Sequence, residues 1–101
     1  MLKHIVMFKV KEECNGKSKQ ELLAQGAKIL DGFKGTIPTL LDFEYKLNMP
    51  GTPDVNFDIA LFCEFNSIEE MDEYKNHPKH LEFRAFITEV REQRACIDYE
   101  I

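Results

Sequence analysis

The sequence predicts an α+β domain in which a four-stranded antiparallel sheet carries all of its helices on one face. Alternating apolar and polar residues, which indicate strands, occur in the order strand, helix, strand, strand, helix pair, strand. Two Ser-x-x-Glu strings, typical of helix N-termini, stand where the first and second helices are expected to begin. The length of 101 residues, with 44% hydrophobic residues, suits a single domain with one core.

The first strand is expected over residues 2–10, where apolar side chains alternate along the chain. One face of this strand carries His4, Val6, Phe8 and Val10. Residues 11–17 are expected to form a loop, because Asn15-Gly16 is typical of a turn.

The first helix is expected to begin at the capping box formed by Ser18 and Glu21. Its apolar stripe consists of Leu22, Gly26, Ile29, Leu30 and Phe33. A glycine on that stripe costs about 1 kcal/mol relative to alanine, so Gly26 is expected to allow a close approach to the sheet. Gly32 and Gly35 are expected to end the helix.

The second strand is expected over residues 40–49 and the third over residues 57–65. The loop between them is longer than a tight hairpin requires, so it either covers a pocket or simply connects the strands. The third strand has apolar residues on both faces, which indicates that both faces are covered. Since the helices of one short chain cover only one face, this strand points to an oligomer.

The second helix is expected to begin at a capping box formed by Ser67 and Glu70 and to end near Tyr74. Pro78 is well placed as the first residue of a third helix, and Arg91 and Arg94 suit the negative end of that helix. The buried stripe of the third helix is Phe83, Phe86, Ile87 and Val90. A fourth strand over residues 95–101 completes the split βαβ, or ferredoxin-like, arrangement.

The composition excludes several classes of partner. The formal net charge is −5 and the basic residues are scattered, so we expect neither a nucleic-acid surface nor an anionic membrane surface. No apolar stretch is long enough to span a membrane, and Lys9 and Lys11 interrupt the first one too early for a signal peptide. Three widely spaced cysteines favour reduced thiols in a cytoplasmic protein over a disulfide framework.

Residues 74–80, with the sequence Tyr-Lys-Asn-His-Pro-Lys-His, are best suited to chemistry. His80 is expected in the first turn of the third helix, where the partial positive charge disfavours a protonated imidazole. A neutral imidazole can take a proton from a carbon next to a carbonyl. Tyr74, near the end of the preceding helix, can hold the carbonyl or enolate oxygen. The string therefore predicts His80 as a base and Tyr74 as a hydrogen-bond donor.

Other interpretations of the histidines stay open. His77 can cap the third helix, His80 can bond a carbonyl inside the core, and His4 can be a core histidine on an apolar strand face. A metal site at His77 and His80 lacks a third ligand at a recognised spacing, and it fails if His77 is the cap. Phosphate-loop and dinucleotide glycine motifs are absent, so we expect no cofactor.

Four stretches together carry a resemblance to a known family: residues 3–9, 58–67, 74–80 and 98–99. On these residues the whole chain resembles the stress-responsive A/B barrel (Dabb) domains, and the Tyr-x-x-His-Pro-x-His string is the sharpest match. The resemblance implies a homodimer, in which two sheets pack face to face into a shared α/β barrel with the helices outside. In that arrangement His4 and Ile59 face the helices. Ile5, Met7, Ala60 and Phe62 would line the barrel between the chains.

The resemblance also implies a possible activity. In a plant polyketide cyclase of this family, residues matching Tyr74 and His80 close a linear polyketide by an aldol reaction without a cofactor, and a histidine matching His4 lies by the pocket. The present chain differs, since Ile59 replaces a histidine and the first helix has no tyrosine. We therefore expect a small hydrophobic or aromatic ligand, and the alternative is a non-catalytic, stress-associated binding or structural dimer. The expected substrate-binding residues are His4, Ile59, Leu61 and Phe83.

Overall fold

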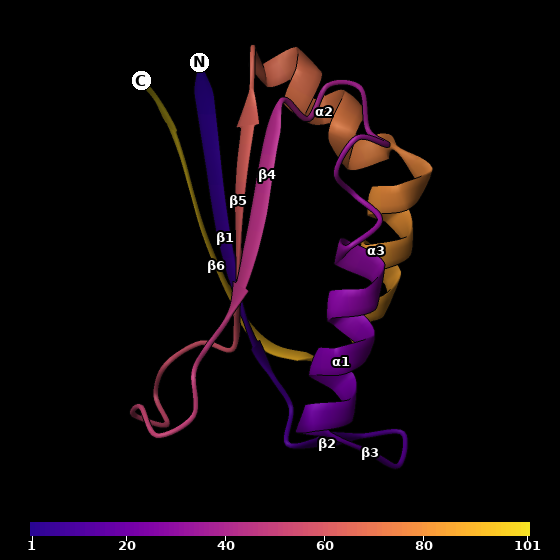
Figure 1. Cartoon of the computed structure of the whole chain (residues 1–101), viewed down its shortest axis with the longest axis vertical. Helices are drawn as coiled ribbons and strands as arrows, with labels where there is room; N and C mark the ends of the chain where they lie inside the picture. The colour runs from indigo at the N-terminus through magenta and orange to yellow at the C-terminus, as the bar shows by residue number, and fades with distance from the viewer.

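In the computed structural model, residues 1–101 form a four-stranded antiparallel sheet with three helices on one face (Figure 1). The strands lie in the order β4-β5-β1-β6, with bounds β1 Leu2–Val10, β4 Asp42–Leu47, β5 Ile59–Phe65 and β6 Arg91–Glu100. The helices are α1 Lys19–Leu30, α2 Ile68–Asn76 and α3 Pro78–Val90. The predicted ferredoxin-like arrangement is confirmed.

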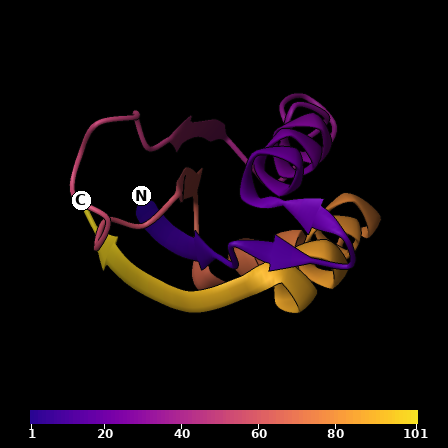
Figure 2. The same ribbon diagram turned by 90° about the horizontal axis from the view of Figure 1, so that it is seen from below.

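The central strand β1 fixes the geometry of the sheet, because it pairs antiparallel with both β5 and β6. His4 lies opposite Cys63 on β5 and Asp98 on β6, so its side chain sits near the middle of the sheet. The two termini lie side by side at one end of the sheet (Figure 1). β6 is an edge strand that bends along its length (Figure 2), and its pairing with β1 shifts between Lys9 and Val10.

The two faces of the sheet differ sharply in burial. The face under the helices carries most of the core, including Val6, Phe8, Ile59, Leu61, Cys63 and Phe65. The opposite face has no helix over it (Figure 1) and exposes Met7, Phe62, Ile97 and Tyr99. As predicted, His4 and Ile59 lie on the helix side, whereas Met7 and Phe62 lie on the bare side.

Helix α1 begins as the sequence predicts, with a complete capping box between Ser18 and Glu21. It ends at Leu30 with Asp31 as its C-cap, before either predicted glycine. A Cβ atom built on Gly26 would lie 3.2 Å from the Phe86 ring of α3 and 3.7 Å from Ile59 of β5. The glycine thus allows close approach to the sheet and to the neighbouring helix.

The corner between α2 and α3 is set by two caps. Ser67 accepts a hydrogen bond from the Glu70 amide, but the Glu70 side chain accepts from Asn66 instead of closing the predicted capping box. His77 ends α2 and caps α3, with its Nδ1 accepting from the Lys79 amide at 3.1 Å. Pro78 follows as the first helical residue, as predicted. The chain therefore turns sharply between Tyr74 and His80.

Several predicted boundaries are corrected. β4 is shorter than residues 40–49, β5 begins at Ile59 rather than at residue 57, and α2 continues two residues past Tyr74. β6 begins at Arg91 rather than at residue 95, so Arg91 and Arg94 belong to a strand and not to the last turn of α3. The predicted loop 11–17 contains a short hairpin formed by β2 Glu13–Cys14 and β3 Lys17–Ser18. None of the helices is long and apolar enough to cross a membrane.

Candidate functional site

A pocket of about 320 Å³ lies between the helix face of the sheet and helices α2 and α3. Five of the predicted site residues line it, from four different elements: His4, Leu61, Tyr74, His80 and Phe83. The other lining residues are Val6, Phe8, Lys75, Arg84, Ile87, Thr88, Arg91 and Arg94. The fold thus brings residues from both ends of the chain to one cavity.

His80 is held in one orientation by the end of α2. Its Nδ1 lies 3.1 Å from the carbonyl oxygen of Lys75. A carbonyl oxygen only accepts hydrogen bonds, so Nδ1 carries the proton and Nε2 of the neutral ring keeps a free lone pair. Burial lowers the pKa of His80 to about 4, and the nearby charges of Arg84 and Lys75 act in the same direction. The ring is therefore neutral near pH 7, with Nε2 as an acceptor.

Tyr74 packs directly against this ring, with the two ring centroids 4.6 Å apart. Its side chain is buried, and its hydroxyl lies 3.8 Å from Sγ of Cys63 on β5. Burial raises the pKa of Tyr74, so the hydroxyl stays protonated and acts as a donor. Burial also raises the pKa of Cys63 to about 12, so this thiol is not a nucleophile at neutral pH.

A cluster of aromatic rings fixes the positions of Tyr74 and His80. Phe33, in the turn after α1, is fully buried and lies 6.2 Å from Tyr74 and 6.4 Å from His80 between ring centroids. Phe65 of β5 lies 5.0 Å from Tyr74 on the sheet side. Because these rings are enclosed by the core, the pair has little freedom to move away from the pocket.

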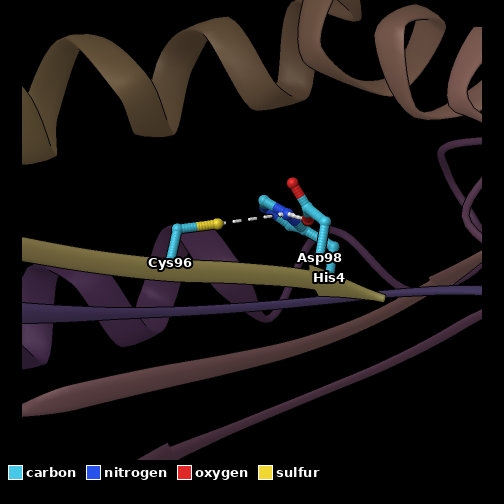
Figure 3. A group of neighbouring side chains, drawn as sticks. All are labelled: His4, Cys96 and Asp98. Carbon is cyan, nitrogen blue, oxygen red and sulfur yellow. Dashed lines mark hydrogen bonds and ion pairs between the residues drawn. The ribbon is translucent and has the colours of Figure 1, made fainter. Parts of the chain in front are cut away.

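His4 forms a second polar group on the wall of the pocket. Figure 3 shows it beside Cys96 and Asp98. Its Nδ1 lies 2.5 Å from Oδ1 of Asp98 and 3.5 Å from Sγ of Cys96, and all three side chains project from the sheet toward the helices. An Nδ1–H donating to Asp98 fixes the tautomer, so Nε2 of the neutral ring is an acceptor. His4 is buried, as expected for a core histidine, and it is also hydrogen-bonded to Asp98 and lines the pocket.

The His4, Cys96 and Asp98 side chains are also the residues best arranged to hold a metal. Their ligand atoms lie within 4.8 Å of one another, and zinc takes all three ligand types. The sequence did not suggest this group, because more than ninety residues separate His4 from its two partners. Only the pairing of β1 with β6 brings them together. In the sequence, Asp98 belongs only to the stretch 98–99 that carries the family resemblance.

The structure bears on two further points about the candidate site residues. Ile59 faces the helices but is not among the residues that line the pocket, and its side chain packs under Gly26 of α1 instead. His77 and His80 do not form a paired metal site, because Nδ1 of His77 accepts from the Lys79 amide and Nδ1 of His80 bonds the Lys75 carbonyl. The interpretation of His77 as a helix cap is confirmed.

The long loop between β4 and β5 does not cover this pocket. It projects on the side of the sheet away from the helices (Figure 1). Its exposed Met49 and Val55, together with Met7 and Leu47, line a separate and more open groove beside the bare face. The loop therefore adds apolar surface to the face that no helix covers.

Solved structures share this fold along nearly the whole chain. A dimeric protein of unknown function and ferredoxin-like fold from Bacteroides fragilis NCTC 9343 is 30% identical, with a TM-score of 0.84 and coverage of 99% of this chain and 95% of that one. A dimeric ferredoxin-like protein from Thermobifida fusca YX is 19% identical, with a TM-score of 0.82 and coverage of 99% and 90%. A hydroxynitrile lyase from Passiflora edulis is 17% identical, with a TM-score of 0.78 and coverage of 99% and 92%. The last two show the fold alone.

The sequence itself identifies the family. No curated protein matches the chain. The sequence model of the family described as Stress Responsive A/B Barrel Domain (Dabb) matches residues 2–101. These residues include the whole sheet and all three helices. The chain therefore belongs to the stress responsive A/B barrel domain family.

Proposed function

We propose that this protein is a homodimer in which each subunit carries a small-molecule pocket, and that His80 acts there as a general base on a carbonyl compound without a cofactor. The observation that carries the proposal is the orientation of His80. The Lys75 carbonyl holds Nδ1–H, and the neutral ring lines the pocket beside Tyr74. An oriented neutral imidazole next to a hydroxyl donor is the arrangement that enolate chemistry requires.

The chemical step is a proton transfer. Nε2 of His80 takes a proton from a carbon next to the substrate carbonyl, and the C–H electron pair passes into the enolate. The Tyr74 hydroxyl, which burial keeps protonated, donates to the enolate oxygen. The enolate then attacks a second carbonyl or leaves the pocket, and the imidazolium returns its proton, so no oxidant or reductant is needed. The aromatic and aliphatic pocket wall suits a polyketide-like or aromatic substrate.

The bare face of the sheet supports the homodimer. Phe62 and Ile97 are 40% and 59% exposed, and they lie on either side of Ile5 of β1. Contiguous apolar surface of this kind on a soluble domain marks an interaction site. Two of the solved relatives, including the 30% identical one, are described as dimeric. A second copy placed face to face would cover the patch and complete a barrel.

Hydrogen–deuterium exchange into a carbon acid tests the proposed base directly. Acetophenone is a suitable probe, because a simple aryl methyl ketone exchanges its methyl C–H only slowly in D2O near neutral pH. Any acceleration can be followed by proton NMR, and no particular product needs to be known. The wild-type protein is expected to accelerate this exchange over buffer. His80→Gln, which keeps a polar side chain but has no basic nitrogen, is expected to reduce the rate to that of buffer. Equal rates for the folded variant and the wild type would remove His80 as the base.

A dimer that binds small molecules without catalysis is the second candidate. It is favoured by the burial of Tyr74, which is 1% exposed and whose hydroxyl already faces the Cys63 thiol. In that case His80 and Tyr74 would serve the core, and ligands would occupy the pocket without being changed. Ligand binding with no exchange above the buffer rate, in both the wild type and His80→Gln, would support this candidate.

We also propose a cytoplasmic location. Cys14, Cys63 and Cys96 are all free thiols, and Cys96 is exposed, which suits a reducing compartment. Thiol titration of protein isolated without reductant is expected to find three free thiols per chain. A disulfide between chains in that material would contradict the proposed location.

A further inference from the structure

All three arginines of the chain line the pocket that holds His80. Arg84 comes from α3, and Arg91 and Arg94 come from β6. Of the ten lysines, only Lys75 joins them there. The chain as a whole carries a net charge of −5, so this concentration of positive charge runs against the overall charge balance.

These cations have no anionic partner within the chain. No aspartate or glutamate is among the residues that line the pocket. The ion pairs of the protein use Lys3, Lys19, Lys46 and His4, and none of them includes an arginine. None of the arginines donates to an oxygen atom of another side chain or of the backbone either. Asp98, which is near His4, is already hydrogen-bonded to that ring.

The pocket also has a direction, because its charged and apolar residues differ in burial. Arg84 and Arg94 are exposed, which places them at the solvent side of the cavity. Val6, Phe8 and Leu61 are buried and form its inner wall. A ligand that matches this gradient has an apolar ring at one end and a negative charge at the other.

We propose that the pocket binds a small aromatic carboxylic acid, with its ring against the inner wall and its carboxylate between Arg84 and Arg94. This inference deepens the proposed function, since it names the substrate class of the same pocket. Guanidinium groups hold carboxylates with paired, charge-assisted hydrogen bonds, and the absence of competing carboxylates leaves them available. The ring of such an acid lies beside His80 and Tyr74, where its carbonyl or hydroxyl substituents meet the proposed base and donor.

Two further roles follow for the bound anion. Its charge offsets that of Arg84, which otherwise disfavours the imidazolium of His80, so the ligand makes proton uptake by the ring easier. A negative charge held at the solvent side also orients the ring inward. The same arginines thus select the ligand and position it for the base.

Calorimetric titration of the wild-type protein with salicylate and with salicylamide tests the assignment. The two probes have the same ring and hydroxyl group, and only salicylate is an anion. Salicylate is expected to bind at least about tenfold more tightly than salicylamide. Arg84→Gln and Arg94→Gln are each expected to weaken salicylate binding by about tenfold and to leave salicylamide binding unchanged. Both arginines are exposed, so the variants are expected to fold.

Lys34→Gln is the matched control, because it removes one exposed positive charge outside the pocket. Its affinity for salicylate is expected to equal that of the wild type. Equal affinity for the two probes, or equal weakening by Lys34→Gln and Arg84→Gln, would overturn the proposal. Inorganic phosphate is a third probe, and phosphate binding as tight as that of salicylate would overturn the aromatic acid as the ligand class.

The outcome is separable from that of the deuterium-exchange experiment. Arginine-dependent salicylate binding in a protein that does not accelerate exchange would leave the anion site standing and remove the catalytic role of His80. Exchange that depends on His80, in a protein that binds the two probes equally, would leave the catalytic role of His80 standing and remove the anion site. Each proposal therefore fails on its own measurement.

Discussion

At the scale of single residues, the chemistry of the pocket depends on how two histidines are held. His80 donates from Nδ1 to the Lys75 carbonyl, and His4 donates from Nδ1 to Asp98. Each ring then has an unprotonated Nε2 when neutral. The partners differ in charge, because Asp98 supplies a carboxylate and Lys75 supplies a neutral carbonyl. The pocket thus combines two imidazoles in different electrostatic surroundings.

The lowered pKa of His80 predicts how stability changes with pH. The ring takes up a proton below about pH 4 in the folded protein, whereas the ordinary value of 6.5 applies to the unfolded chain. Between these values the unfolded chain binds more protons, so the free energy of unfolding falls as the pH is lowered through this window. Burial lowers the pKa of His80 most, the hydrogen bond to the Lys75 carbonyl acts against it, and the charges of Arg84 and Lys75 lower the pKa further.

Chemical denaturation at several pH values, on wild type and His80→Gln, measures this effect. The loss of stability between pH 6.5 and 4 is expected to be smaller in the variant, because it lacks the ring. Other titrating groups contribute equally to both proteins. An equal loss of stability in the wild type and the variant over this pH range would mean that folding does not lower the pKa of His80.

Tyr74→Phe separates a catalytic hydroxyl from a structural one. The hydroxyl has only a weak sulfur partner 3.8 Å away, so its removal is expected to cost less than about 1 kcal/mol of stability. If Tyr74 donates to the enolate, deuterium exchange is expected to slow by about 10²-fold. Denaturation and exchange on the same sample give both numbers, and a large loss of stability with unchanged exchange would assign the hydroxyl to the core.

Local sequence patterns alone predict the part of the site whose residues lie close together along the chain. Tyr74, His77 and His80 belong to one short string, and helix capping rules place them around a corner. The contact of His4 with Asp98 depends instead on strand register, which no local pattern specifies. The gathering of the arginines has the same cause, because Arg84 and Arg94 meet only after β6 has paired with β1.

At the scale of elements, the site depends on the corner between α2 and α3. His77 ends one helix and caps the next, and Pro78 starts the second with a fixed φ angle. This corner places Tyr74 and His80 on adjacent ends of two helices, with their rings in contact. A change in the geometry of this corner would therefore move the Tyr74 and His80 rings within the pocket.

His77→Ala tests the role of the cap. Loss of the bond to the Lys79 amide is expected to cost about 1 kcal/mol in the free energy of unfolding, as for other N-caps. His77→Asn, which supplies a side-chain oxygen at the same place, is expected to recover most of the loss. Urea denaturation of the three proteins is the measurement. Equal destabilisation by Ala and Asn would show that the imidazole has a role other than capping.

Element boundaries were predicted less well where propensity and tertiary pairing disagree. Residues 91–94, Arg-Glu-Gln-Arg, have no apolar alternation and suit a helix end, yet they form the start of β6 because β1 offers unpaired backbone groups there. Arg91 pairs with Val10 and Arg94 with Phe8 across the sheet. That pairing is what directs these side chains into the pocket.

At the scale of the whole molecule, the two faces of the sheet have separate roles. The helix face builds the core and the pocket, and the other face presents Met7, Phe62, Ile97 and Tyr99 to solvent. Apolar residues on both faces of β5 are evident from the sequence, and they predict this surface without knowledge of the fold. The sequence of one chain does not predict how a partner would be placed on that face, since that placement depends on a second chain.

Phe62→Lys is expected to weaken the proposed homodimer, because it would bury a charge in the middle of the bare face. Leu81→Lys is the matched control, since Leu81 is similarly exposed but lies on α3, on the other side of the molecule. Light scattering during size-exclusion chromatography is expected to show a shift toward monomer for Phe62→Lys alone. A similar shift for both variants would indicate general destabilisation rather than a specific interface.

The bare face exposes Met7, Phe62, Ile97 and Tyr99 to water unless a second copy covers it, and that second copy is the central claim. Sedimentation equilibrium of the wild-type protein at micromolar concentration tests this most directly. We predict a single species with twice the chain mass of 11.8 kDa. A stable species with the mass of one chain at that concentration would contradict the account.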